Sequence, residues 1–215
     1  MNKYIFFDCD GTLSNNEHCH KLSRNRLLTT LGLDPKVYSD KAIGVSKMHF
    51  WKNIVSWCNI TSYTAEELAK KDFEMLFEII KENNVKLSPN LITVLDKLIA
   101  DGNKCYIVSS SNRAYLENVL KYWKIDSYFS GIFSGDEVVK AKPDPEIYIK
   151  AYTSIGVDSK DCYAIEDSHS GVTAAKKANI YTIAYKPDEY SVYNDDVSKA
   201  DIIIKDMIQI LNIIK

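Results

Sequence analysis

From about residue 86 onward, short apolar segments alternate with stretches of helical spacing, and no other feature of the sequence limits the fold as much. Apolar segments typical of strands lie at 105–108, 128–133, 163–165 and 180–185, with a further candidate at 200–204. Apolar residues recur with helical spacing in 91–99, 115–120 and 147–155. Strands that alternate with helices form a parallel sheet with helices on both faces, so we expect an α/β fold with a doubly wound sheet.

A first strand is expected at residues 3–7, and it ends in Asp8-Cys9-Asp10-Gly11-Thr12. Carboxylates two residues apart in extended backbone point the same way. They repel each other, but they suit a divalent cation. The alternative is a polar turn without chemistry, which Asp-Gly pairs commonly form.

Three further polar motifs follow strands or lie near strand ends. Glu166 and Asp167 come directly after residues 163–165, and in a parallel sheet they would join Asp8 and Asp10 at one edge. Four carboxylates at one place favour a hard divalent cation.

Ser109-Ser110-Ser111-Asn112 follows another expected strand. Hydroxyls and backbone N–H groups at a helix start can hold phosphate oxygens, and a helix-capping role is compatible with this. Lys142, which precedes Pro143, could offset the negative charge of a phosphoryl group, although a lone lysine usually lies on the surface.

Residues 15–85 break the alternation, because they contain three helical patterns and no convincing strand. The last pattern is preceded by Thr64-x-x-Glu67, which predicts a capping box. We therefore expect two domains. Residues 1–14 and 86–215 would form the α/β core, and residues 15–85 an all-helical insert.

Charge and cysteine content exclude several kinds of partner. The formal net charge is -2, so no basic field exists to hold nucleic acid or an acidic membrane surface. The apolar run before Asp8 is too short for a signal peptide or a membrane span. Five cysteines without a C-x-x-C pair favour reduced thiols. We expect a cytoplasmic monomer with a small-molecule partner.

The motifs together resemble the four ordered motifs of the haloacid dehalogenase (HAD) superfamily. The resemblance rests on Asp8-Cys-Asp10-Gly-Thr-Leu, Ser109, Lys142-Pro-Asp-Pro and Glu166-Asp167-Ser168-x-x-Gly171, and it spans nearly the whole chain. It implies a Rossmann-like core with a small helical cap, in the subgroup of β-phosphoglucomutases and sugar phosphatases.

The resemblance also implies roles for individual residues. Asp8 would attack phosphorus and form an aspartyl-phosphate, and Asp10 would act as acid and then as base. Ser109 and the backbone N–H of Ser110 would bind phosphoryl oxygens, with Lys142 neutralising them.

The implied cofactor is Mg²⁺, held by the Asp8 carboxylate, the Asp10 backbone carbonyl and Asp167, with Glu166 bound directly or through water. The second acid, Asp10, disfavours the dehalogenase branch, in which the leaving halide needs no proton.

Two features of the insert resemble cap positions of β-phosphoglucomutases, namely His20 and Gly44-Val45-Ser46-Lys47. We treat His20 and Lys47 as candidate substrate contacts, with a solvated lysine as the alternative for Lys47. Asn15-Asn16 departs from the Asp-Ser or Asp-Thr usual after the catalytic loop.

The sequence thus predicts a Mg²⁺-dependent phosphatase of small phosphorylated metabolites, most readily sugar phosphates. A phosphomutase that passes the phosphoryl group to a sugar hydroxyl is the alternative. A third reading, a non-catalytic phosphate-binding module, would be favoured by loss of an acid, but all four acids are present.

Overall fold

The computed structural model describes residues 2–42, 45–188 and 196–214. The chain divides into two compact units, which are described separately. One is an α/β unit made of the residues up to Asn15 and those from Lys86 onward, and the other is a helical unit made of Asn16–Val85.

A six-stranded parallel sheet forms the centre of the α/β unit, with the order β3-β2-β1-β4-β5-β6 among the described residues. The strands are β1 (Tyr4–Phe7), β2 (Lys104–Val108), β3 (Phe129–Phe133), β4 (Cys162–Glu166), β5 (Tyr181–Tyr185) and β6 (Ile202–Ile204). The order changes direction at β1, which pairs with β2 on one side and β4 on the other. Ligands of open α/β sheets bind at such a switch point.

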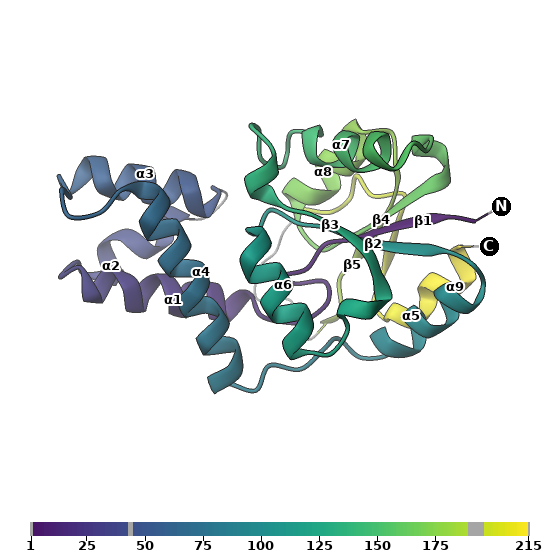
Figure 1. The fold of residues 1–215 in the computed structure, drawn as a ribbon, viewed down its shortest axis with the longest axis horizontal. Coiled ribbons are helices and arrows are strands. Elements are labelled where there is room, and N and C mark those ends of the chain that lie inside the picture. Colours follow the sequence, from purple (N-terminus) through teal and green to yellow (C-terminus); the bar gives the residue numbers. More distant parts are fainter. Residues whose placement is uncertain (1, 43–44, 189–195, 215) are drawn as a thin grey trace. The chain divides into compact units, whose positions relative to one another are not determined.

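Helices cover both faces of this sheet (Figure 1). α7 (Glu146–Ile155) and α8 (His169–Lys177) lie on one face, and α5 (Leu91–Ala100) and α9 (Ile210–Ile213) on the other. α6 (Arg113–Tyr122) packs against β3. Short 3-10 helices occupy Asp126–Tyr128, Gly135–Glu137, Ser159–Asp161 and Met207–Gln209. The predicted α/β class is confirmed.

The core between the sheet and α7 and α8 follows from strand alternation. Phe6, Val108 and Ala164 point toward this face and are fully buried against the apolar sides of the two helices. The helix residues in contact with them are mostly small, such as Ala151, Ala174 and Ala175, which lets the helices approach the sheet closely.

The helical unit contains α1 (Glu17–Thr30), α2 (Pro35–Tyr38), α3 (Lys47–Trp57) and α4 (Ala65–Glu82), with a 3-10 segment at Ser39–Ala42. Its core consists of Leu27, Leu28, Phe50, Trp51, Ile54 and Leu68 with their neighbours. The predicted capping box at α4 is confirmed, since the side chain of Thr64 accepts from Glu67 N and that of Glu67 accepts from Thr64 N.

The chain leaves and re-enters the α/β unit through neighbouring backbone. Ser14 forms an antiparallel bridge with Leu87, and Ser88 N donates to Leu13 O at 2.8 Å. The Ser88 hydroxyl also donates to Thr12 O at 2.7 Å. These bonds hold the two ends of the inserted helical segment next to each other within the α/β unit.

The sequence does not predict three of the α-helices, namely α2, α8 and the short C-terminal α9. α8 buries Gly171, Val172, Ala174 and Ala175, whose small side chains give only a weak apolar period. α2 is a single turn that begins after Asp34, whose side chain accepts from Lys36 N at 2.9 Å. In the described part of the chain, no helix is long and apolar enough to cross a membrane.

Candidate active site

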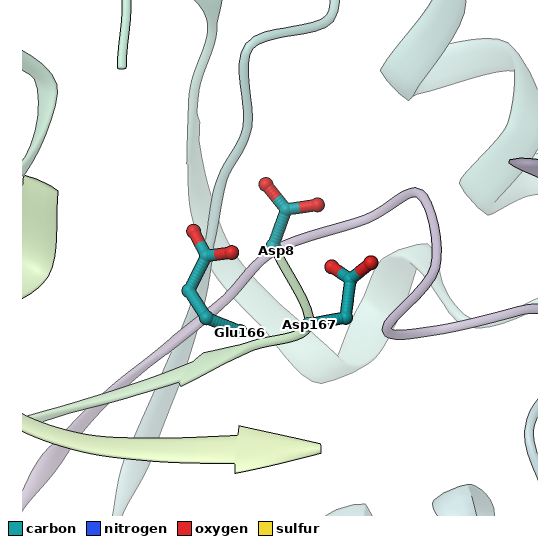
Figure 2. Close-up of side chains that lie close together, drawn as sticks. All are labelled: Asp8, Glu166 and Asp167. Carbon is teal, nitrogen blue, oxygen red and sulfur yellow. The ribbon is translucent and has the colours of Figure 1, made fainter. Parts of the chain in front are cut away.

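Asp8, Glu166 and Asp167 lie together because their strands are neighbours. Phe7 of β1 pairs with Ile165 of β4, so the residues that follow leave the sheet side by side. Asp8 N donates to Ile165 O at 3.0 Å. Figure 2 shows the three carboxylate groups close to one another, and each offers an oxygen within 4.8 Å of the other two. Three of the four acids of the predicted cluster, Asp8, Glu166 and Asp167, therefore lie together at the carboxyl ends of the strands.

Lys142 is buried in this cluster, with a side chain 3% exposed. Its Nζ donates to Asp8 Oδ1 at 2.7 Å, to Glu166 Oε1 at 2.6 Å and to the Val108 carbonyl at 2.9 Å. The alternative of a surface lysine is wrong. The β2 carbonyl and the two carboxylates fix the ammonium group between β1, β2 and β4.

Tyr148 of α7 completes the surroundings of Lys142 and Glu166, although its spacing in the sequence predicts only an apolar helix position. Its hydroxyl donates to Glu166 Oε1 at 2.6 Å, and its ring centre lies 5.1 Å from Lys142 Nζ. Burial, together with the charge of Glu166, raises the pKa of Tyr148 well above its ordinary value. The phenol therefore stays protonated and remains a donor.

The cluster holds more negative charge than one lysine neutralises. Burial raises the pKa of Asp8 to about 7, and repulsion from Glu166 and Asp10 acts in the same direction against the opposing charge of Lys142. Burial by itself would lower the pKa of Lys142, but Asp8 and Glu166 outweigh it and raise that pKa. A divalent cation among these oxygens would offset the excess charge, so the residues fit Mg²⁺.

Two glycines leave room for the carboxylates. At Gly11, where φ is +80°, a Cβ atom would lie 2.0 Å from Asp167 Oδ2. At Gly171 a Cβ atom would lie 1.9 Å from Glu166 Oε2. Thr12 Oγ1 donates to Asp167 Oδ1 at 3.1 Å. The Asp-Gly-Thr motif therefore shapes the space around Asp167.

Asp10 follows in the loop after β1 and is half-buried. Ser111 Oγ donates to its Oδ2 at 2.6 Å, and Tyr115 OH donates to its Oδ1 at 2.6 Å. From the sequence, Ser111 is expected only as part of the serine motif that could hold phosphate oxygens, and a bond to Asp10 is not predicted for either residue. Tyr115 lies in an apolar helical pattern, which predicts packing and not a hydroxyl partner.

The serine segment after β2 lies beside this carboxylate. Ser109 is buried, and its N–H donates to the Phe133 carbonyl at 3.0 Å, so the sheet uses this donor. Ser110 is exposed. The predicted helix cap is Asn112, whose Oδ1 accepts from Tyr115 N at 2.9 Å.

The candidate residues of the helical unit belong to α1 and α3. His20 is half-buried on α1, and Lys47 is the first residue of α3. Lys47 Nζ lies 2.7 Å from Oδ1 of Asp72, which is fully buried. The alternative of a freely solvated Lys47 is therefore wrong. Gly44 of the predicted motif lies outside the described residues.

Asp72 is the centre of a polar cluster in the helical unit. Ser23 Oγ donates to it at 2.6 Å and Trp51 Nε1 at 2.9 Å. Burial alone would raise the pKa of Asp72, but the Lys47 charge and these hydrogen bonds lower it overall. Asp72 is thus held as a carboxylate inside the helical core.

The doubly wound sheet with acidic strand ends agrees with the haloacid dehalogenase resemblance of the sequence motifs. A comparison of the chain with family models gives the same result. The model described as haloacid dehalogenase-like hydrolase matches residues 5–185. The chain belongs to this family and is an enzyme of it.

The proteins to which this chain is similar align with most of its length. Protein CbbY of Rhodobacter capsulatus is 28% identical, over 95% of this chain and 93% of its own. Beta-phosphoglucomutase of Bacillus subtilis (strain 168) is 26% identical, over 84% of this chain and 82% of its own. The crystal structure of a CbbY mutant from Rhodobacter sphaeroides with xylulose-(1,5)bisphosphate has a TM-score of 0.82 at 21% identity, over 96% and 95% of the two chains. That structure supports the fold alone.

Proposed function

We propose that the protein is a Mg²⁺-dependent phosphatase of small phosphorylated metabolites, with sugar phosphates as the favoured class. The observation that carries the proposal is the group formed by buried Asp8, Lys142 and Glu166 with half-buried Asp167 at the switch point of the sheet. Family membership as a hydrolase supports water as the acceptor.

The carboxylates of Asp8 and Asp167 would hold Mg²⁺, with Glu166 bound directly or through water and the Asp10 backbone carbonyl as a further ligand. When bound, Mg²⁺ would reduce repulsion between the nucleophile and the phosphoryl oxygens. Oxygen donors and excess negative charge are what this cation prefers.

The chain's own residues would carry two displacements. In the first, an Asp8 carboxylate oxygen forms a bond to phosphorus while the bond to the leaving oxygen breaks, and Asp10 gives that oxygen a proton. In the second, water attacks the aspartyl-phosphate and Asp10 takes the water proton, so inorganic phosphate leaves and Asp8 is regenerated. The Ser109 hydroxyl, the Ser110 N–H and Lys142 would bind the phosphoryl oxygens.

We propose further that residues 15–85 act as a cap domain on a core of residues 1–14 and 86–215. The cap would contribute substrate contacts and exclude water. His20 and Lys47 are the candidate contacts. One relative connects the proposal to phosphorylated sugars, since it is a beta-phosphoglucomutase.

Release of inorganic phosphate tests the proposal. Wild-type protein should hydrolyse para-nitrophenyl phosphate and at least one member of a sugar-phosphate panel in Mg²⁺, and chelation of Mg²⁺ should remove the activity. Asp8→Asn should be inactive, and activity that survives this change would show a contaminating phosphatase. Absence of Mg²⁺-dependent release on every substrate would refute the proposal.

Trapping the covalent intermediate tests the mechanism separately. A radiolabelled substrate quenched in acid should leave label on the wild-type protein, and hydroxylamine, which cleaves acyl phosphates, should remove it. No label should remain on Asp8→Asn.

A phosphomutase is the second candidate, and the similarity to beta-phosphoglucomutase favours it. It would use the same aspartyl-phosphate but pass the phosphoryl group to a sugar hydroxyl. Interconversion of β-glucose 1-phosphate and glucose 6-phosphate, faster than phosphate release, would support it. Phosphate release without isomer formation would exclude it.

A further inference from the structure

The carboxylate of Asp10 is held at both oxygens by hydroxyl groups that follow β2. Ser111 Oγ lies 2.6 Å from Oδ2, and Tyr115 OH lies 2.6 Å from Oδ1. All three residues belong to the α/β unit. Bonds to both oxygens restrict rotation of a carboxylate more than a bond to one oxygen does, because the group can no longer turn about its last torsion without losing a partner.

The backbone of the two residues that carry these hydroxyls is itself held by hydrogen bonds. Tyr115 is 2% exposed, and its N–H donates to Asn112, the residue that caps α6. Ser111 is 5% exposed, and its carbonyl accepts from Gly135 N at 2.9 Å. The phenol therefore comes from a rigid helix start and not from a mobile loop, as a group that orients another should.

We infer that Tyr115 is a positioning residue that aims the carboxyl group of Asp10 at the leaving oxygen. The inference rests on the proposed function, in which Asp10 is the acid and base. An acid must lie within hydrogen-bonding reach of the oxygen that it protonates, and a small error in its position is costly. Tyr115 itself need not touch the substrate.

Tyr115→Phe is the informative variant, because it keeps the buried ring and removes only the hydroxyl. The matched control is Tyr128→Phe, which also deletes a phenol-to-carboxylate bond, from Tyr128 OH to Asp96 Oδ1 at 2.8 Å, but outside the site. Thermal unfolding of both variants shows whether either change damages the fold.

The measurement compares how much the variant lowers kcat for a substrate with a poor leaving group and for one with a good leaving group. A sugar alkoxide is a poor leaving group that needs a proton, whereas para-nitrophenolate leaves with little help. We expect Tyr115→Phe to lower kcat for the best sugar phosphate of the panel roughly tenfold, with little change in KM. The loss with para-nitrophenyl phosphate should be markedly smaller. Tyr128→Phe should change neither rate.

A double-mutant cycle makes the test specific for Asp10. In an Asp10→Asn background, Tyr115→Phe should have no further effect on turnover, because the group it positions no longer acts as an acid. Equal losses on both substrates in the single variant would mean a general structural role and would overturn the inference. So would an unchanged rate on the sugar phosphate.

A crystal structure of Tyr115→Phe gives a reading that does not depend on turnover. The Asp10 side chain should leave the orientation found in a wild-type crystal structure, and an unchanged orientation would overturn the inference. Failure of the proposed function looks different, since the wild-type protein would then release no phosphate from either substrate.

Discussion

Lys142 donates a hydrogen bond to Asp8, with Nζ 2.7 Å from Oδ1. The pair is buried, so its two charges depend on each other more than a surface pair does. Removal of the ammonium group leaves the Asp8 carboxylate buried without this partner. The contact therefore bears on stability as well as on the proposed chemistry.

Lys142→Met should abolish Mg²⁺-dependent phosphate release. In buffer without Mg²⁺ it should also lower the free energy of unfolding by about 3–5 kcal/mol, the usual cost of breaking a buried ion pair from one side. Urea denaturation followed by circular dichroism measures this. Lys97→Met is the control, because Lys97 and Asp101 form an exposed pair and its loss should cost less than about 1 kcal/mol. Equal stability of the two variants would contradict the prediction.

Gly171→Ala should impair the site without creating a cavity in the core, because it adds a methyl group and removes no side chain. The new Cβ atom would lie 1.9 Å from Glu166 Oε2, so the carboxylate must leave the position in which it accepts from Lys142. We expect phosphate release to fall at least about tenfold, since a displaced charged partner is worth roughly 1.5–3 kcal/mol. Gly131→Ala is the control, because its Cβ atom would make only ordinary contact at 3.4 Å with the Tyr106 ring. A fully active Gly171→Ala would show that the position of Glu166 is not critical.

Mg²⁺ should stabilise the wild-type protein against heat. At a Mg²⁺ concentration one hundred times Kd, a cation that binds only the folded chain adds about 2.7 kcal/mol. Asp167→Asn should lose most of this gain, because one of the three clustered carboxylates is neutralised. Asp144→Asn, which changes an acid outside that cluster, should keep the gain. The midpoint of thermal unfolding with and without Mg²⁺ measures the effect, and an equal gain in both variants would place the cation elsewhere.

Asp72→Asn should destabilise the helical unit, and the effect should depend on pH. The pKa of Asp72 in the folded state lies below its ordinary 3.8, so its stabilising contribution is complete above that value and is lost as pH falls through the folded pKa. We expect a cost of about 3 kcal/mol at pH 7, and a smaller difference from the wild type below about pH 3.8.

Denaturation of the wild type and Asp72→Asn at neutral and acid pH measures that difference. Asp40→Asn serves as the control, since Asp40 is exposed and lies 3.5 Å from Lys21. Its loss should cost less than about 1 kcal/mol at either pH. A cost of Asp72→Asn that stays constant from pH 7 to acid pH would mean that the charge of Asp72 does not stabilise the unit.

The strands of the sheet could be predicted because each contains closely spaced apolar residues, even where the run is interrupted, as by Ser130 and Gly131 in β3. β2 begins one residue before its predicted start, and β3 begins one residue later than predicted because Tyr128 belongs to a 3-10 turn. α8 could not be predicted from periodicity, because the residues that it buries are glycine, valine, threonine and alanine. These small residues contribute to the stability of the fold by close packing, and the spacing of apolar residues along the sequence does not reveal it.

The acidic cluster could be predicted for a simple geometric reason. Asp8 and Glu166 end neighbouring parallel strands, so a fold class and two strand ends are enough to bring them together. The burial of Lys142 could not be predicted, because a lysine is exposed unless its tertiary partners are known. The same holds for Tyr115 and Tyr148, whose helical spacing indicates packing but whose hydroxyl partners, Asp10 and Glu166, are distant in the sequence.

The helical segment is an insertion whose two ends are joined inside the α/β unit. Ser14 bridges Leu87, and Ser88 is bound to Leu13 and Thr12. Because these bonds join the two ends of the segment inside the α/β unit, a change of sequence within residues 16–85 need not alter the register of β1 with β2 and β4. The inserted segment can therefore change during evolution while the acidic residues at the strand ends keep their positions.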